Sequence, residues 1–211
     1  YFDDDAYFDN DTLPVYAPQG KYDDAFIAKH DSSGNLIWAK SIYGTWYERG
    51  EDIHTYDGGL LVTGNFNDSL YVDSIALLET SWWKNLFIAK YSETGQVEWV
   101  VNSHGKYYQQ PDDYISRIQT DAWGNIYVSG HFQDSIGFGN LTIYGKGGKD
   151  IFLASFDSLG NVMTIVYDLA DKKRAEKILN YIKKEKIDKP YPMKAIFPAV
   201  KRGSKYWKDY F

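Results

Sequence analysis

The sequence predicts a mainly β fold, built from repeated units and followed by a helical C-terminal appendage. Three observations support this prediction. Blocks of sequence recur about every 63 residues, as in a repeat architecture, apolar and polar residues alternate within them as in β-strands, and the charge and the pattern both change near residue 164. We therefore expect repeats over residues 1–163, and a basic helix with a tail rich in proline and aromatic residues over residues 164–211.

The composition of the 211 residues is that of a folded protein with an uneven charge. Hydrophobic residues make up 44% and aromatic residues 18%, which excludes general disorder. Residues 168–211 hold 13 Lys and Arg against 6 Asp and Glu, whereas residues 1–167 hold 10 against 23. The net charge of −6 thus combines a basic tail with strongly acidic repeats, which supports the division into two segments.

The sequence also gives no indication of several common features, namely disulfides, membrane spans, a signal peptide and metal sites. The chain has no cysteine, so it has no disulfide, thiolate metal site or cysteine nucleophile. No apolar run approaches the roughly 18 residues that a membrane span needs, and no signal peptide is visible, since Tyr1 leads into an acidic stretch. The histidines are not kept between repeats, and the N-terminal aspartates do not match the spacing of a helix–loop–helix calcium site. We expect no metal, no cofactor and no catalytic residue.

The first repeated block consists of a strand, a turn and a returning strand. It begins at residues 24–29, 85–90 and 150–155, which read DAFIAK, NLFIAK and DIFLAS. A glycine follows the phenylalanine of each strand at the same distance along the chain, in turns where Asp and Ser can hydrogen-bond the backbone and Gly accepts positive φ. Each block therefore predicts a hairpin. Trp38 and Trp99 occupy the same position on two of the returning strands, and we expect both to be structural.

The second block also occurs more than once. Residues 61–70 read LVTGNFNDSL and residues 127–136 read YVSGHFQDSI, while the N-terminus aligns with the first of these copies, with Phe2 at the position of Phe66. The chain thus contains two full repeat units plus partial ends. Four strands in a unit of about 63 residues fit a propeller blade. The fold expected for residues 1–163 is an incomplete β-propeller-like array of four-stranded blades.

Together, the strings DAFIAK, SGNLIWAK and GNIYVSG resemble the β-propeller repeats of secreted surface proteins of Bacteroidetes. The match covers residues 1–163. It implies a non-catalytic scaffold or binding module that is secreted or lies on the cell surface and has a protein or glycan surface as its partner.

The C-terminal segment predicts a helix that ends at a proline-rich stretch. Asp171 can cap a helix whose apolar residues form one stripe, and Pro190 stops that helix. The strings RAEKIL at 174–179, PYP at 190–192 and YWKDYF at 206–211 resemble part of a six-hairpin (α/α)6 glycosidase of the amylo-α-1,6-glucosidase and neutral invertase group. None of that family's catalytic acids can be placed here, and glycoside hydrolysis needs two carboxylates on a preformed scaffold.

Three functions are compatible with this organisation. The first is a non-catalytic extracellular scaffold or binding module that forms a homo-oligomer or belongs to a larger parent protein, because too few blades to close a ring leave open sheet edges. The second is a fragment of a carbohydrate-active glycoside hydrolase, and the third an artificial or misassembled chimera without a function of its own. Nucleic acid is not an expected partner, because the basic residues of the tail are interleaved with apolar ones.

Candidate binding residues are aromatic side chains on predicted loops, where flat rings can stack on sugars or dock partners. These residues are Trp82, Trp83, Tyr107 and Tyr108. Five Asp-Ser/Thr-apolar sequences are similar to the O-glycosylation sequence of Bacteroidetes, although the same residues are ordinary in turns. The hydroxyl residues of these sequences are Thr12, Ser69, Ser74, Ser135 and Ser158.

Overall fold

The computed structural model describes residues 1–8, 11–14, 22–56, 58–78, 84–105 and 114–167. Every regular secondary-structure element in this part of the chain is a β-strand, so the prediction of a mainly β fold is confirmed. The chain divides into two units, residues 1–169 and 170–211. The predicted C-terminal helix falls in the second unit, outside the described residues.

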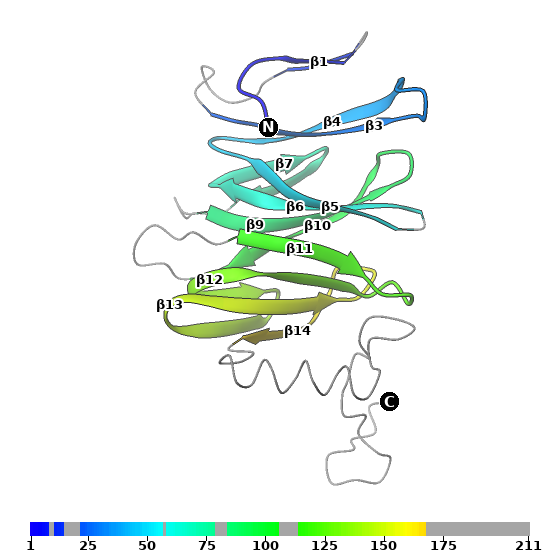
Figure 1. Cartoon of the computed structure of the whole chain (residues 1–211). Coiled ribbons are helices and arrows are strands. Elements are labelled where there is room, and N and C mark those ends of the chain that lie inside the picture. Colours follow the sequence, from blue (N-terminus) through cyan, green and yellow to red (C-terminus); the bar gives the residue numbers. More distant parts are fainter. Residues whose placement is uncertain (9–10, 15–21, 57, 79–83, 106–113, 168–211) are drawn as a thin grey trace. The chain divides into compact units, whose positions relative to one another are not determined.

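The described strands form three antiparallel layers, stacked face to face (Figure 1). The first layer consists of β3 (Ala25–His30) and β4 (Leu36–Gly44). The second layer consists of β5 (Arg49–Tyr56), β6 (Gly59–Asn67), β9 (Lys84–Ser92) and β10 (Val97–His104). The third layer consists of β11 (Tyr114–Thr120), β12 (Ile126–Phe138), β13 (Leu141–Phe156) and β14 (Val162–Tyr167).

Each repeat unit contains a small side hairpin, which in the second and third units pairs with the last strand of the preceding layer. In the second unit it is β7 (Ser69–Val72) and β8 (Ile75–Leu78), and β7 pairs with β4. In the third unit the end of β12 and the start of β13 take this place, and Phe138 pairs with Ser103 of β10. Hydrogen bonds therefore join successive layers at their sides, and the second and third layers belong to one eight-stranded sheet.

The N-terminus supplies the side hairpin of the first unit. This hairpin is formed by β1 (Ala6–Phe8) and β2 (Asp11–Leu13). Phe2 bridges to Asp24, the residue before β3, just as Phe66 pairs with Asn85 near the start of the equivalent strand β9. The sequence alignment of Phe2 with Phe66 is thus reproduced in the structure.

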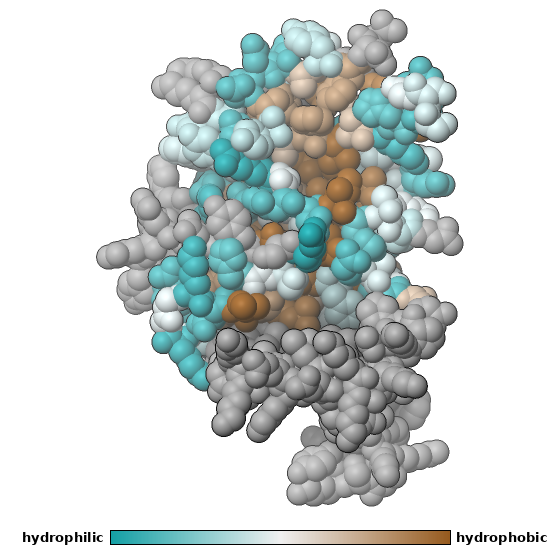
Figure 2. Space-filling view, in the orientation of Figure 1, coloured by the Kyte–Doolittle hydropathy of each residue, from teal (hydrophilic) through white to brown (hydrophobic). Residues whose placement is uncertain are grey.

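Two apolar cores fill the spaces between the layers. The core between the first and second layers includes Ile27, Phe66 and Phe87, and the core between the second and third includes Leu86 and Phe152. The second layer is therefore buried on both faces, and most residues of β6 and β9 are buried. In the space-filling view, apolar surface runs across the layers between polar side chains (Figure 2).

The layers are not closed into a propeller. The last described strand, β14, continues to Tyr167, beyond the boundary at Met163 that the repeat pattern indicated. The boundary between the two units follows at Leu169 and Ala170. No helix among the described residues has the length and apolar character that a membrane crossing requires.

Candidate binding site between the second and third layers

A tryptophan and a lysine in each of the first two layers hold a turn of the next layer. In the first layer, the indole Nε1 of Trp38 and the Nζ of Lys29 both donate to the carbonyl oxygen of Glu93, at 3.2 and 3.1 Å. Glu93 lies in the turn between β9 and β10. We call this arrangement the Trp–Lys clamp.

The clamp recurs between the second and third layers with almost the same geometry. The indole Nε1 of Trp99 donates to the carbonyl oxygen of Ser158 at 3.2 Å, and the Nζ of Lys90 donates to it at 3.1 Å. Ser158 lies in the turn between β13 and β14. Because both clamps use equivalent positions of the repeat, they define a common way of joining one layer to the next.

Each clamped turn needs a glycine under the indole ring. Gly95 and Gly160 have φ of 79° and 85°, a region that favours glycine. A Cβ would lie 2.7 Å from the Trp38 ring at Gly95 and 2.9 Å from the Trp99 ring at Gly160. The equivalent Gly34 of the first layer has φ of 87°, but a Cβ there would meet nothing within 4 Å. The glycine spacing seen in the sequence thus serves both the turn and the contact with tryptophan.

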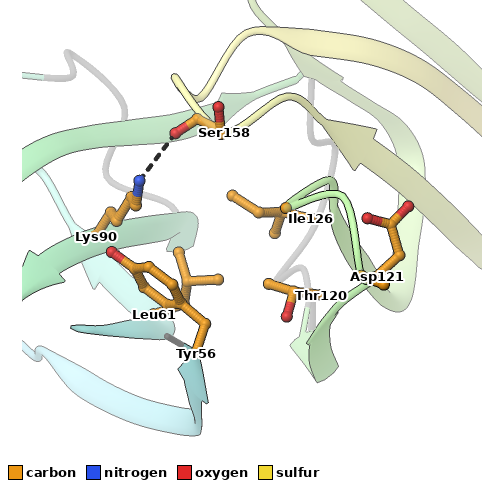
Figure 3. Close-up of a pocket in the computed structure, with 9 residues that line it drawn as sticks. Tyr56, Leu61, Lys90, Thr120, Asp121, Ile126 and Ser158 are labelled. Carbon is orange, nitrogen blue, oxygen red and sulfur yellow. Dashed lines mark hydrogen bonds between the residues drawn. The ribbon is translucent and has the colours of Figure 1, made fainter. Parts of the chain in front are cut away.

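Beside the second clamp lies a cavity of about 370 Å³ (Figure 3). Tyr56, Leu61 and Lys90 of the second layer line one side of it. Thr120, Asp121 and Ile126 of the third layer line the other, and Ser158 closes it above Lys90. The cavity combines apolar side chains with the ammonium of Lys90, and the carboxylate of Asp121 points away from its centre, toward its own turn (Figure 3).

The ammonium of Lys90 is already engaged by its own chain. It lies 3.0 Å from a carboxylate oxygen of Glu98 and 5.1 Å from the centre of the Tyr56 ring. Burial disfavours the charged form, but the hydrogen bond to Glu98 and the neighbouring Tyr56 outweigh it and raise the pKa of Lys90 above its ordinary value. The raised pKa favours the charged ammonium of Lys90.

The carboxylate of Asp121 is engaged as well. It accepts hydrogen bonds from the backbone amides of Trp123 and Asn125, from the Asn125 side chain and from the Tyr127 hydroxyl. Burial works against ionisation, but these hydrogen bonds, above all those from Asn125, hold the pKa of Asp121 below its ordinary value. Lys90 thus holds the turn of the next layer, Asp121 holds its own turn, and the pKa shifts of both groups favour their ionised forms.

The aromatic residues predicted to bind a partner, Trp82, Trp83, Tyr107 and Tyr108, all lie outside the described residues. Of the hydroxyl residues in the predicted glycosylation sequences, Thr12, Ser74 and Ser158 are exposed. Ser69 and Ser135 are buried, with exposed fractions of 6% and 3%, and the Ser69 hydroxyl hydrogen-bonds that of Thr45. Modification at these two positions would require the side hairpin to open.

Sequence analysis missed a buried acidic pair at the junction of the first two layers. Asp24 and Glu48 are both fully buried. Burial, and then the negative charge of Asp24, raise the pKa of Glu48 to about 9, although the backbone amides of Asn67 and Trp46 oppose the shift. Asp24 belongs to the first repeated block, but nothing in the sequence around Glu48 marks it as buried.

Two histidines also contribute contacts that the sequence did not indicate. The Nε2 of His54 lies 2.9 Å from the hydroxyl of Thr120, across the second and third layers. The Nε2 of His104 lies 3.0 Å from the hydroxyl of Thr142. Within the described ranges, no group of three His, Asp or Glu side chains is placed to hold a metal ion.

Comparison with known proteins gives no family model that matches the chain and no curated protein with significant similarity to it.

Proposed function

We propose that the chain is a non-catalytic extracellular scaffold or binding module built from propeller-type blades. The observation that carries this proposal is the Trp–Lys clamp, which recurs with the same two donor types, each on a backbone carbonyl at the equivalent position, at both junctions between layers. A contact that is copied with the repeat unit serves the addition of layers, whereas a catalytic site has no reason to be copied. The extracellular setting rests on the resemblance of the repeats alone.

The engaged charges of the cavity also support a non-catalytic role. Acid–base catalysis needs a group whose pKa lies near the working pH. Lys90 and Asp121 are instead shifted further from neutrality, in the direction that keeps each of them ionised. The four-stranded antiparallel second layer has the strand order of a blade, β5-β6-β9-β10, which supports propeller-type units.

The two outer faces of the stack differ in a way that bears on assembly. In the third layer the positions of the clamp residues hold Thr164 and Ser155, so this layer cannot form the clamp on its far side. The first layer keeps the receiving half of the clamp, because Gly34 has open space where an indole ring would lie. We expect association to use the face of the first layer.

Light scattering coupled to size-exclusion chromatography over a hundredfold range of concentration tests the proposed assembly. We expect the mass to rise with concentration, since the open first layer exposes apolar residues such as Phe26, which is 39% exposed. A folded monomer at every concentration would contradict self-assembly.

A glycosidase assay on the intact chain tests the absence of catalysis. We expect no release of nitrophenol from a panel of nitrophenyl glycosides above the buffer rate. Turnover that grows in proportion to the amount of protein would overturn the non-catalytic proposal.

A further inference from the structure

We infer that the cavity beside the second clamp binds a small, neutral aromatic molecule between the second and third layers. The inference rests on the proposed function and deepens it, because it names a ligand class for the binding module. The cavity has a volume of about 370 Å³. Since a cavity on the order of 150 Å³ already accommodates benzene, this one has room for a molecule of one or two rings.

The third-layer wall of the cavity comes from a turn that is longer than its counterpart in the second layer. In the second layer the paired residues Tyr56 and Gly59 enclose a turn of two residues. In the third layer the paired residues Thr120 and Ile126 enclose five. Because the clamp is the same at both junctions, joining the layers does not require the longer turn. The residues of this turn that line the cavity are Asp121, Ala122 and Gly124.

Both walls of the cavity are held in place by the chain itself. The carboxylate of Asp121 accepts the backbone amides of Trp123 and Asn125, both at 2.9 Å, and so fixes the longer turn. On the other side the second clamp fixes Lys90 to the carbonyl oxygen of Ser158 at 3.1 Å. A ligand that enters a cavity with fixed walls orders few further groups, which lowers the entropic cost of binding.

The innermost side chains of the cavity are apolar. Leu61 and Ile126 line it from opposite layers, and their exposed fractions are 0% and 1%. Figure 3 shows Tyr56 and Leu61 on the side of the second layer and Ile126 pointing toward them from the third. An apolar ligand would remove its surface from water against these side chains, which favours binding.

The charged groups at the cavity favour a ligand without charge. The ammonium of Lys90 lies 3.0 Å from a carboxylate oxygen of Glu98, so an anionic ligand has to compete with Glu98. A cationic ligand is repelled by Lys90. The carboxylate of Asp121 does not offset this repulsion, because it points to its own turn and is hydrogen-bonded there. A neutral ligand avoids both costs.

The same ammonium favours an aromatic ring over a saturated one. An ammonium is attracted to the face of an aromatic ring when it lies within about 6 Å of the ring centre, and Lys90 already lies 5.1 Å from the centre of the Tyr56 ring. Because Lys90 lines the cavity, an aromatic ring bound there can approach its ammonium as well. A saturated ring of equal size covers the same apolar surface without this attraction.

Benzyl alcohol and cyclohexylmethanol are matched probes for the test, since both are neutral and differ only in the ring. Each is added to the intact chain up to about 20 mM, and NMR detects nuclear Overhauser effects between its ring protons and the methyl groups of Leu61 and Ile126. A molecule that stays on the surface does not reach these two side chains. We expect effects from benzyl alcohol to both, and binding about two- to fivefold tighter than that of cyclohexylmethanol.

Two charged probes test the requirement for a neutral ligand. Benzoate and benzylammonium keep the aromatic ring of benzyl alcohol and add a negative or a positive charge. We expect both to bind roughly tenfold more weakly than benzyl alcohol. No Overhauser effect from benzyl alcohol to Leu61 or Ile126 at the highest concentration would overturn the inference, and so would equal or tighter binding of cyclohexylmethanol or of either ion.

The repeat supplies a matched pair of variants for the role of the ammonium. Lys90→Met keeps the aliphatic stem and removes the charge, so the preference for benzyl alcohol over cyclohexylmethanol should disappear. Lys29→Met makes the same change in the first clamp, away from the cavity, and should leave the preference intact. A preference that survives in Lys90→Met would contradict the assigned role. The comparison of probes on the parent chain stands even if Lys90→Met does not fold.

The outcomes distinguish this inference from the proposed function. Absence of probe contacts with Leu61 and Ile126 in a chain that self-associates and shows no turnover would refute the aromatic site and leave the scaffold proposal standing. Benzyl alcohol in the cavity of a chain that hydrolyses glycosides would support the site and refute the non-catalytic role.

Discussion

Replacing Gly95 by alanine is expected to destabilise the fold far more than the same replacement at Gly34. Both glycines occupy the same position of equivalent turns, with φ of 79° and 87°. Alanine at either position incurs the cost of a left-handed backbone, about 1 to 2 kcal/mol. At Gly95 the new Cβ would also lie 2.7 Å from the Trp38 ring, whereas at Gly34 it meets nothing within 4 Å. We expect a total loss of about 3 kcal/mol or more for Gly95→Ala.

Urea unfolding of the two variants measures this difference. The excess cost at Gly95 should disappear when Trp38 is first replaced by alanine, because the ring that collides with the Cβ is then absent. Gly160 and Gly124 offer a second matched pair, since a Cβ on Gly160 meets the Trp99 ring at 2.9 Å and one on Gly124 meets only Ser158, at 3.9 Å. Equal losses within both pairs would show that the indole rings do not hold the turns.

The repeated strands could be predicted from the sequence because their signals are local. The turns that begin at Asp31, Asp121 and Asp157 carry an aspartate whose carboxylate accepts backbone amides two and four residues later, as Asp31 does from Ser33 and Asn35 at 2.8 and 2.9 Å. In the turn between β9 and β10 the hydroxyl of Ser92 takes this place and accepts the amide of Gln96 at 3.1 Å. A short side chain with an oxygen and a glycine three residues later therefore recur at fixed positions. The structural role predicted for Trp38 and Trp99 followed from their shared spacing, and both side chains take part in clamps.

The way in which layers join could not be read from the sequence. In each clamp the acceptor is a backbone carbonyl, and its residue differs between copies, Glu93 in one and Ser158 in the other. An acceptor that every residue possesses leaves no sequence signal. In β6 and β9 the sequence does not alternate between apolar and polar residues, because both faces of the second layer are buried, so this pattern could not show which face contacts which layer.

The buried acidic pair was invisible for a related reason. Glu48 stands in the string WYERGED, which is as polar as an exposed connection. It becomes buried because Glu48 donates its backbone amide to the carbonyl oxygen of Asp23 at 2.8 Å, which brings the connection against the first layer. That hydrogen bond joins two segments that are far apart in the sequence. Its energetic consequence is that the Glu48 carboxyl group is removed from solvent.

Glu48→Gln is expected to stabilise the protein above neutral pH and to flatten the dependence of its stability on pH. The pKa of Glu48 is raised to about 9 in the folded chain, from an ordinary value of 4.5. Between these values the folded state holds a proton that the unfolded state has released. The free energy of unfolding therefore falls as pH rises through this window, by up to about 1.4 kcal/mol per pH unit. Glutamine keeps the shape of the protonated acid and does not titrate.

Urea unfolding at a series of pH values from 4 to 9 measures the effect. The variant and the parent should be of similar stability near pH 4, where Glu48 is protonated in both states. At pH 7.5 we expect the variant to be more stable by about 2 to 4 kcal/mol. Glu93→Gln is the control for replacing a glutamate by glutamine at an exposed position, since the Glu93 side chain is 76% exposed. A difference between Glu48→Gln and the parent that stays constant over the whole range would mean that Glu48 ionises normally, and that the junction of the first two layers admits water.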